Sequence, residues 1–146
     1  MRHKTIGFPF YFHLIEYADQ LYVPEPDWND IRFQKLLELA ATHVIFVNDF
    51  FSYEKEMREQ NNEHGKVFNP VSLIIQIEGL SVGKAFESLA KIIGDLEKEI
   101  LIVENEILCD ESFSKDTRTF IERMNYLMGG HFKVYSNVFN RYYQAK

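Results

Sequence analysis

Residues 47–56 read VNDFFSYEKE. This stretch decides which side of its helix can be buried and which side must stay near polar groups. The run before it is rich in Leu, Val, Ile and Phe, so that helix has a large apolar surface to bury. Within the stretch, Asn48, Ser52 and Glu56 recur at every fourth position. Each such step turns an α-helix by about 40° beyond a full turn, so the three side chains are expected on one stripe.

The chemistry of this stripe favours a hard divalent cation. Asn48, Ser52 and Glu56 each offer an oxygen ligand, which suits Mg²⁺ or Mn²⁺, with water or a bound phosphate in the remaining octahedral positions. One carboxylate alone holds such an ion weakly, so much of the affinity must come from a phosphorylated ligand that arrives with the metal. Lys55 lies beside Glu56 and can reach an anionic oxygen as a point charge. The stretch therefore predicts a joint site for metal and anion.

Composition narrows the class of protein. The 146 residues are 46% hydrophobic and 26% charged, which is typical of one globular domain spanning residues 1–146. A formal net charge of -6 argues against nucleic-acid binding, because phosphate contacts need a basic surface. Cys109 is the single cysteine, which excludes an internal disulfide and fits the cytosol. We expect no membrane span, since no apolar run reaches about 18 residues. We also expect no signal peptide, since residues 1–4 are not followed by the small-residue cleavage pattern of one.

The hydrophobic spacing predicts an all-α protein, a helical bundle without strands or repeats. The proline-containing segment 23–26 should end the first helix. Asp27 or Asn29 should cap the second helix at its N-terminus. Gly129-Gly130 should break or kink the last helical region. The expected helices cover residues 8–22, 30–59, 71–77, 81–108, 116–128 and 130–143.

Helix-capping residues support two of these boundaries. Asn69-Pro70 is typical of an N-cap followed by proline in the first turn, and it should begin the short third helix, which Gly79 should end. Ser81 should then cap the fourth helix, whose apolar stripe continues to about Leu108.

Residues 48–56, NDFFSYEKE, resemble the second metal-binding motif of class I terpene synthases, ND-x-x-S-x-x-K-E. The resemblance implies that Asn48, Ser52 and Glu56 bind one Mg²⁺ (or Mn²⁺) of a trinuclear cluster. It also implies that Lys55 contacts the diphosphate of a prenyl diphosphate substrate. The expected activity is that of a lyase: ionisation and cyclisation of the prenyl chain.

Both ends of the chain extend the resemblance. Arg2 precedes the motif at the offset of the family's diphosphate-sensing arginine, and Arg141-Tyr142 resembles the RY pair that reaches the diphosphate when the site closes. The family fold further implies that Phe8, Phe12 and Phe132 help to shape an apolar pocket, in which ring faces stabilise carbocations. The implied fold is a part of the class I terpenoid synthase bundle.

The chain departs from the family in one major respect. It corresponds to the second half of a catalytic domain, and no aspartate-rich DDxxD-type motif, which would bind the other two metals, occurs in the sequence. Phe132 also stands where the family often has Trp. We therefore expect the chain alone to be catalytically weak or inactive, and to need an N-terminal half or a partner chain. We also expect it to expose an apolar face where that other half would pack.

Each of these residues also has a simpler interpretation. A polar series at every fourth position is usually the solvated face of a helix, and Lys55 can simply pair with Glu59. Arg2 and Arg141-Tyr142 can be ordinary surface residues near the termini, and the phenylalanines ordinary core. The competing class is a non-catalytic helical interaction module derived from a terpene synthase. Prenyl length, product and oligomeric state do not follow from the sequence.

Overall fold

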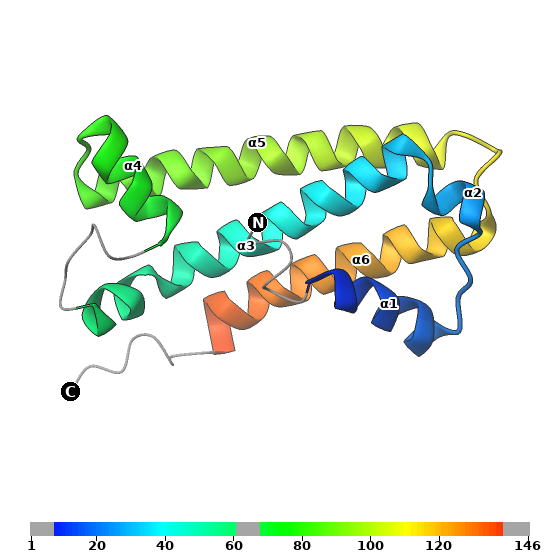
Figure 1. The fold of residues 1–146 in the computed structure, drawn as a ribbon, viewed down its shortest axis with the longest axis horizontal. Coiled ribbons are helices and arrows are strands. Elements are labelled where there is room, and N and C mark those ends of the chain that lie inside the picture. Colours follow the sequence, from blue (N-terminus) through cyan, green and yellow to red (C-terminus); the bar gives the residue numbers. More distant parts are fainter. Residues whose placement is uncertain (1–7, 61–67, 139–146) are drawn as a thin grey trace. The chain divides into compact units, whose positions relative to one another are not determined.

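The computed structural model describes residues 8–60 and 68–138, and within these ranges it consists of helices and loops (Figure 1). The predicted all-α class is confirmed. No described helix is long and apolar enough to cross a membrane. The elements are α1 (Phe8–Asp19), α2 (Glu25–Trp28), α3 (Ile31–Glu59), α4 (Pro70–Glu78), α5 (Val82–Leu108), α6 (Lys115–Lys133) and a π-helical turn η3 (Val134–Val138).

The start and end of α4 have the predicted N-cap and C-cap residues. The Asn69 side chain accepts a hydrogen bond from the backbone N–H of Val71, and Pro70 occupies the first helical position. Gly79 ends the helix with φ = 66°, in the left-handed region that glycine adopts without a Cβ clash. The α4 boundaries were therefore readable from sequence.

The segment between α1 and α3 differs from the prediction. α1 ends at Asp19, because Gln20 takes a left-handed φ of 53°, and a short helix, α2, forms where only a break was expected. The expected caps Asp27 and Asn29 are wrong. Asp30 caps α3 instead: its Oδ1 accepts from the backbone N–H of Arg32 at 2.8 Å.

The expected break at Gly129-Gly130 is also wrong, since α6 continues through both glycines to Lys133. Each glycine disfavours a helix by about 1 kcal/mol relative to alanine. The buried Met124 and Met128 on the preceding turns favour the helix through packing. The departure from α-helical geometry comes later, at η3.

The described residues fall into two compact units. Unit 1 contains those in the ranges 1–43 and 96–130, and unit 2 those in the ranges 44–95 and 131–146. In unit 1, Phe33 and Phe120 are fully buried with ring centroids 5.5 Å apart, and Trp28 packs edge-on against both rings. Aromatic contact thus joins α2, α3 and α6 within this unit.

Asp27 anchors α2 to the start of α6. It is buried, and its Oδ2 accepts from the backbone N–H of Ser114 at 2.9 Å and from the Thr117 hydroxyl at 2.6 Å. A buried carboxylate needs such donors, because leaving it without them costs several kcal/mol. The residue expected to cap α3 therefore supplies a long-range polar contact.

Unit 2 has its own apolar cluster. Tyr53 and Met57 of α3, Val71 of α4, and Ala85 and Leu89 of α5 are buried together. Phe50 and Phe86 pack against this cluster with ring centroids 5.0 Å apart. The cluster lies on the same part of α3 as the motif 48–56, so it fixes the rotation of that part of the helix.

Asp27→Ala should lower the free energy of unfolding by about 2–4 kcal/mol, because it leaves the Ser114 N–H and the Thr117 hydroxyl without their acceptor. Urea denaturation followed by circular dichroism measures the change. Glu25→Ala, an exposed substitution in the same short helix, should change it by less than about 0.5 kcal/mol. Equal effects of the two substitutions would contradict the assigned role of Asp27.

Candidate metal site

Two of the three predicted metal ligands lie in direct contact. The Ser52 hydroxyl donates to Oε1 of Glu56 at 2.5 Å, one turn farther along α3. Ser52 is buried and Glu56 half-buried, so this pair lies at the edge of the packed interior of unit 2. The helical spacing does bring these two oxygen donors together.

Asn48 begins the same stripe one turn before Ser52. It is half-buried, and its Nδ2 makes a long hydrogen bond of 3.4 Å to Oδ1 of Asp49. That bond uses the nitrogen of the amide, so the oxygen of Asn48 is not consumed by it. Asp49 itself is fully buried, and as the next residue along the helix it points about 100° away from the stripe.

The pair is suited to a hard divalent cation. Cis oxygen ligands of Mg²⁺ at about 2.1 Å are separated by about 3 Å, so Ser52 Oγ and Glu56 Oε1 need to move apart by only about half an ångström. Both side chains can make this adjustment by small rotations. The donor set of carboxylate, hydroxyl and amide oxygen matches the preference of Mg²⁺ and Mn²⁺.

A fourth residue, Asn69, contacts the same carboxylate. Its Nδ2 donates to Oε2 of Glu56 at 3.1 Å and to the backbone carbonyl of Asp49 at 2.8 Å. The sequence identified Asn69 only as the cap of α4. Its contact with Glu56 could not be predicted, because the course of the chain between α3 and α4 is not set by local pattern.

A second polar link joins α4 to α3. The Tyr53 hydroxyl shares a hydrogen bond with Ser72, which moderates the rise that burial causes in the pKa of Tyr53. The Ser72 hydroxyl also lies 3.9 Å from the sulfur of Met57. Together with Asn69, these contacts hold the start of α4 against the face of α3 next to Ser52 and Glu56.

Lys55 lies on the more exposed side of α3. Its Nζ is 3.6 Å from Oε1 of Glu59, the helical ion pair that the simpler interpretation anticipated. The Lys55 side chain is 41% exposed and that of Glu59 60% exposed, so the pair adds little to stability.

No other metal site is apparent in the described ranges, where no group of three or more His, Cys, Asp or Glu side chains could hold an ion. The predicted ligand set contains one carboxylate, one hydroxyl and one amide. Only one of its three residues is therefore of the His, Cys, Asp or Glu type. A site with a single charged ligand needs further anionic ligands, which a diphosphate would bring.

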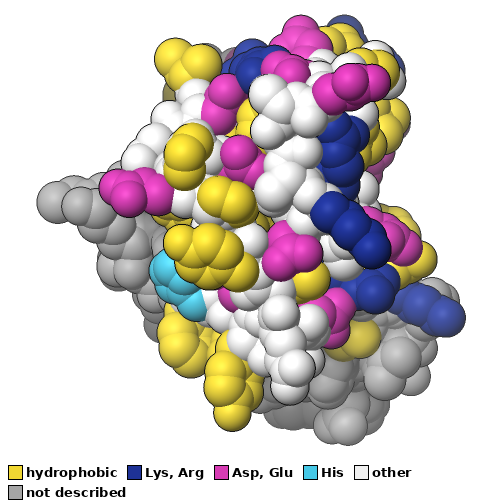
Figure 2. Space-filling view, turned by 90° about the vertical axis from the view of Figure 1, so that its right-hand side faces the viewer, with side chains coloured by type: hydrophobic (Ala, Val, Ile, Leu, Met, Phe, Trp, Pro, Cys, Tyr) yellow, Lys and Arg dark blue, Asp and Glu magenta, His cyan; other side chains and the backbone are white. Residues whose placement is uncertain are grey.

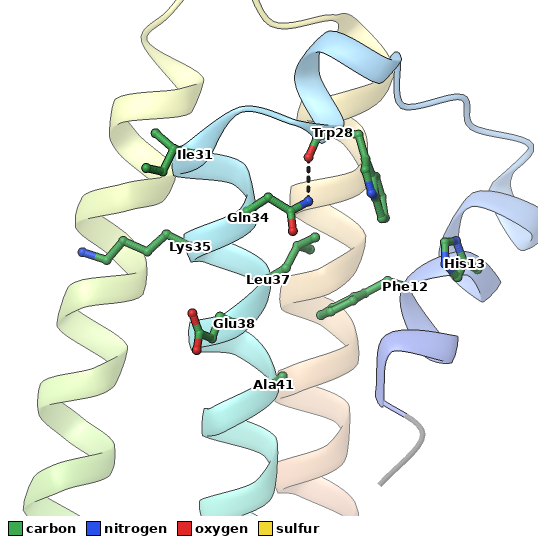
Figure 3. A pocket seen from close by; sticks show the side chains of 9 residues that line it. All are labelled: Phe12, His13, Trp28, Ile31, Gln34, Lys35, Leu37, Glu38 and Ala41. Atoms are coloured by element: carbon green, nitrogen blue, oxygen red, sulfur yellow. Dashed lines mark hydrogen bonds between the residues drawn. The ribbon is translucent and has the colours of Figure 1, made fainter. Parts of the chain in front are cut away.

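Unit 1 contains a pocket of about 790 Å³ (Figure 3). Phe12 from α1, Trp28 from α2, and Leu37 and Ala41 from α3 supply its apolar lining. Gln34 also lines the pocket and donates to the backbone carbonyl of Trp28 at 2.6 Å. The lining is completed by His13, Ile31, Lys35 and Glu38.

The predicted aromatic residues have different environments. Phe12 is 5% exposed, lines the unit 1 pocket, and packs on Phe120 with ring centroids 6.2 Å apart. Phe132 is 50% exposed and packs edge-on against Phe51 within unit 2. Trp28 and Leu37, which also line the pocket, were not singled out in the sequence, because nothing in their spacing separates pocket lining from core.

Several predicted residues lie outside the part of the chain whose side chains are described. These are Arg2, Phe8, Arg141 and Tyr142. Their assignment to diphosphate binding or pocket lining therefore stays a prediction.

The family model of terpene synthase family 2, C-terminal metal binding, matches residues 1–99, which include α3 and its oxygen-bearing stripe. This chain belongs to that terpene synthase family. The match spans more than half of the chain, and residues 48–56 lie within the matched range.

Individual terpene synthases agree with the family model. The chain is 32% identical to terpene cyclase aneC of Aspergillus aculeatus over 47% of its length, and 28% identical to sesterterpene synthase btcA of Colletotrichum orbiculare over 72%. It is 28% identical to a bifunctional sesterterpene synthase of Aspergillus aculeatus over 97% of its length. The matched regions cover 15%, 15% and 20% of these relatives, so the chain spans a fifth of their length or less.

Proposed function

We propose that this chain supplies the second metal-binding motif of a class I terpene synthase, which ionises and cyclises a prenyl diphosphate. The main observation behind this proposal is the contact between Ser52 Oγ and Glu56 Oε1 on α3, which are 2.5 Å apart, in a chain of the terpene synthase family. Asn48, Ser52 and Glu56 would hold one Mg²⁺ or Mn²⁺ ion. When bound, that ion would supply positive charge to the oxygens of the substrate diphosphate.

The basic residues have a separate role in this proposal. Lys55, adjacent to Glu56 and partly exposed, contacts the diphosphate as a point charge. By the family resemblance, Arg2, Arg141 and Tyr142 approach the same group. Their donors stabilise the negative charge that develops on the departing diphosphate, which lowers the barrier to breaking the C–O bond.

The hydrocarbon part of the substrate needs a dry, apolar environment. By the family resemblance, Phe8, Phe12 and Phe132 help to shape this environment. Aromatic ring faces there would stabilise the allylic cation and its successors, and exclusion of water would prevent early capture. The prenyl chain length and the product depend on pocket contours to which other polypeptide contributes.

The activity is incomplete in this chain alone. One metal-binding carboxylate in residues 48–56 is too few for a trinuclear cluster, and the sequence has no aspartate-rich motif. We therefore propose that an N-terminal half or a partner chain carries that motif. The much greater length of the related synthases supports this view.

Exposed apolar side chains are compatible with a second candidate as well. Tyr17 is 84% exposed, Ile31 83% and Ile77 80%, and Figure 2 displays hydrophobic side chains at the surface between acidic and basic ones. Such side chains could contact the other half of a synthase. They could equally serve a non-catalytic interaction module that retains the ancestral motif, so the two candidates differ in ligand binding rather than in exposed surface.

Mg²⁺ and pyrophosphate together, but neither alone, should raise the melting temperature of the purified chain, because the ion and the anion complete each other's ligand sets. At 100 times the apparent dissociation constant, the stabilisation is about 2.7 kcal/mol. Differential scanning fluorimetry measures it. Asn48→Ala and Glu56→Gln should abolish the response.

Glu54→Gln is the matched control, since Glu54 is an exposed carboxylate on the same helix within the same ten residues. It should respond as the natural chain does. A melting curve of the natural chain that is unchanged by Mg²⁺ with pyrophosphate would favour the interaction module over the synthase.

Coexpression with an aspartate-rich segment encoded directly upstream should yield terpene products, whereas the 146-residue chain alone should yield little or none. The reason is that the segment supplies the missing metal-binding carboxylates. Gas chromatography with mass spectrometry of culture extracts measures the products. Product formation that persists with Asn48→Ala would contradict the role of the α3 stripe.

A further inference from the structure

Asn69 is fully buried at the start of α4, and its side chain makes three hydrogen bonds. Its Oδ1 accepts from the backbone N–H of Val71 at 2.9 Å, which caps α4. Its Nδ2 donates to the backbone carbonyl of Asp49 and to Oε2 of Glu56. A primary amide has two N–H donors and one acceptor oxygen, so this environment uses both ends of the group.

The two donor contacts reach different parts of α3. Asp49 O is a backbone atom in the middle of the motif, whereas Glu56 Oε2 is at the end of a flexible side chain. The amide therefore fixes the carboxylate of Glu56 relative to the backbone near Asn48. A flexible carboxylate gains from such a partner because its rotamers are restricted before any ligand binds.

Glu56 is consequently held at both oxygens. Oε1 accepts from the Ser52 hydroxyl at 2.5 Å and Oε2 from Asn69 at 3.1 Å. The Ser52 contact joins two proposed metal ligands, so a bound ion would replace it. The Asn69 contact uses the other oxygen, so it can persist while Oε1 binds the ion.

We propose that Asn69 is a positioning residue for the metal-binding carboxylate of Glu56. This inference rests on the proposed function, since it takes Glu56 as a metal ligand. Asn69 does not itself bind the ion in this account. It orients Glu56 through Oε2 and leaves Oε1 facing Ser52.

The competing explanation is that Asn69 serves only as the N-cap of α4. Ser and Asp are also good N-cap residues, because each carries an oxygen that can accept from the first turn. Neither has an amide N–H₂ to donate to Glu56. Asn69→Ser and Asn69→Asp therefore keep the capping function and remove the positioning contact.

The test measures the Mg²⁺ concentration that gives half of the maximal thermal stabilisation at a fixed, saturating concentration of pyrophosphate. Asn69→Ser should raise this concentration by about 10–100-fold, the usual effect of removing a residue that orients a metal ligand. Asn69→Asp should also raise it, because its carboxylate has no N–H for Oε2 and repels Glu56 from its position. This variant is measured if Asn69→Ser does not fold. Circular dichroism checks the fold of each variant.

Val71→Ala is the control for a purely structural effect. Val71 is fully buried in the same turn of α4, so its truncation should lower the melting temperature without ligand and leave the Mg²⁺ requirement unchanged. An unchanged Mg²⁺ requirement in Asn69→Ser, with a responsive natural chain, would overturn the positioning role and leave the proposed function standing. A natural chain that does not respond to Mg²⁺ with pyrophosphate would overturn both.

Discussion

The polar face of α3 depends on hydrogen bonds that satisfy a carboxylate at the edge of an apolar cluster. Glu56 lies on the same part of the helix as the buried Tyr53 and Met57, so its charge is not simply solvated. Ser52 and Asn69 supply one donor to each of its oxygens. This pairing lets α3 bury one side in unit 2 while side-chain oxygen atoms line another side, which is the arrangement that the proposed metal site requires.

Much of the fold was predictable because its signals are local. The long helix α3, the cap and proline at the start of α4, and the glycine at its end each follow from a few neighbouring residues. The mistakes involve longer-range contacts. Asp27 looked like a cap, yet it binds Ser114 and Thr117, which are far away in the sequence, and the packing of α6 carries the helix through Gly129-Gly130.

The same distinction applies to the site. Helical periodicity was enough to place Ser52 against Glu56, because both belong to one helix. It could not place Asn69, which reaches Glu56 from another helix, nor distinguish Phe12 of the unit 1 pocket from ordinary core. The single carboxylate of the stripe predicted a phosphorylated ligand, and the family resemblance implies that this ligand is a prenyl diphosphate.

The most direct test of the metal site is paramagnetic broadening by Mn²⁺ in the presence of pyrophosphate, observed in ¹H–¹⁵N spectra of the assigned chain. The broadening falls steeply with distance from the ion, so it locates the ion. The account predicts that broadening is strongest for the signals of residues 48–56 and of the Asn69 side-chain amide and weakens with distance from them, with recovery on addition of excess Mg²⁺. Broadening centred on another acidic region, with these signals intact, would contradict it.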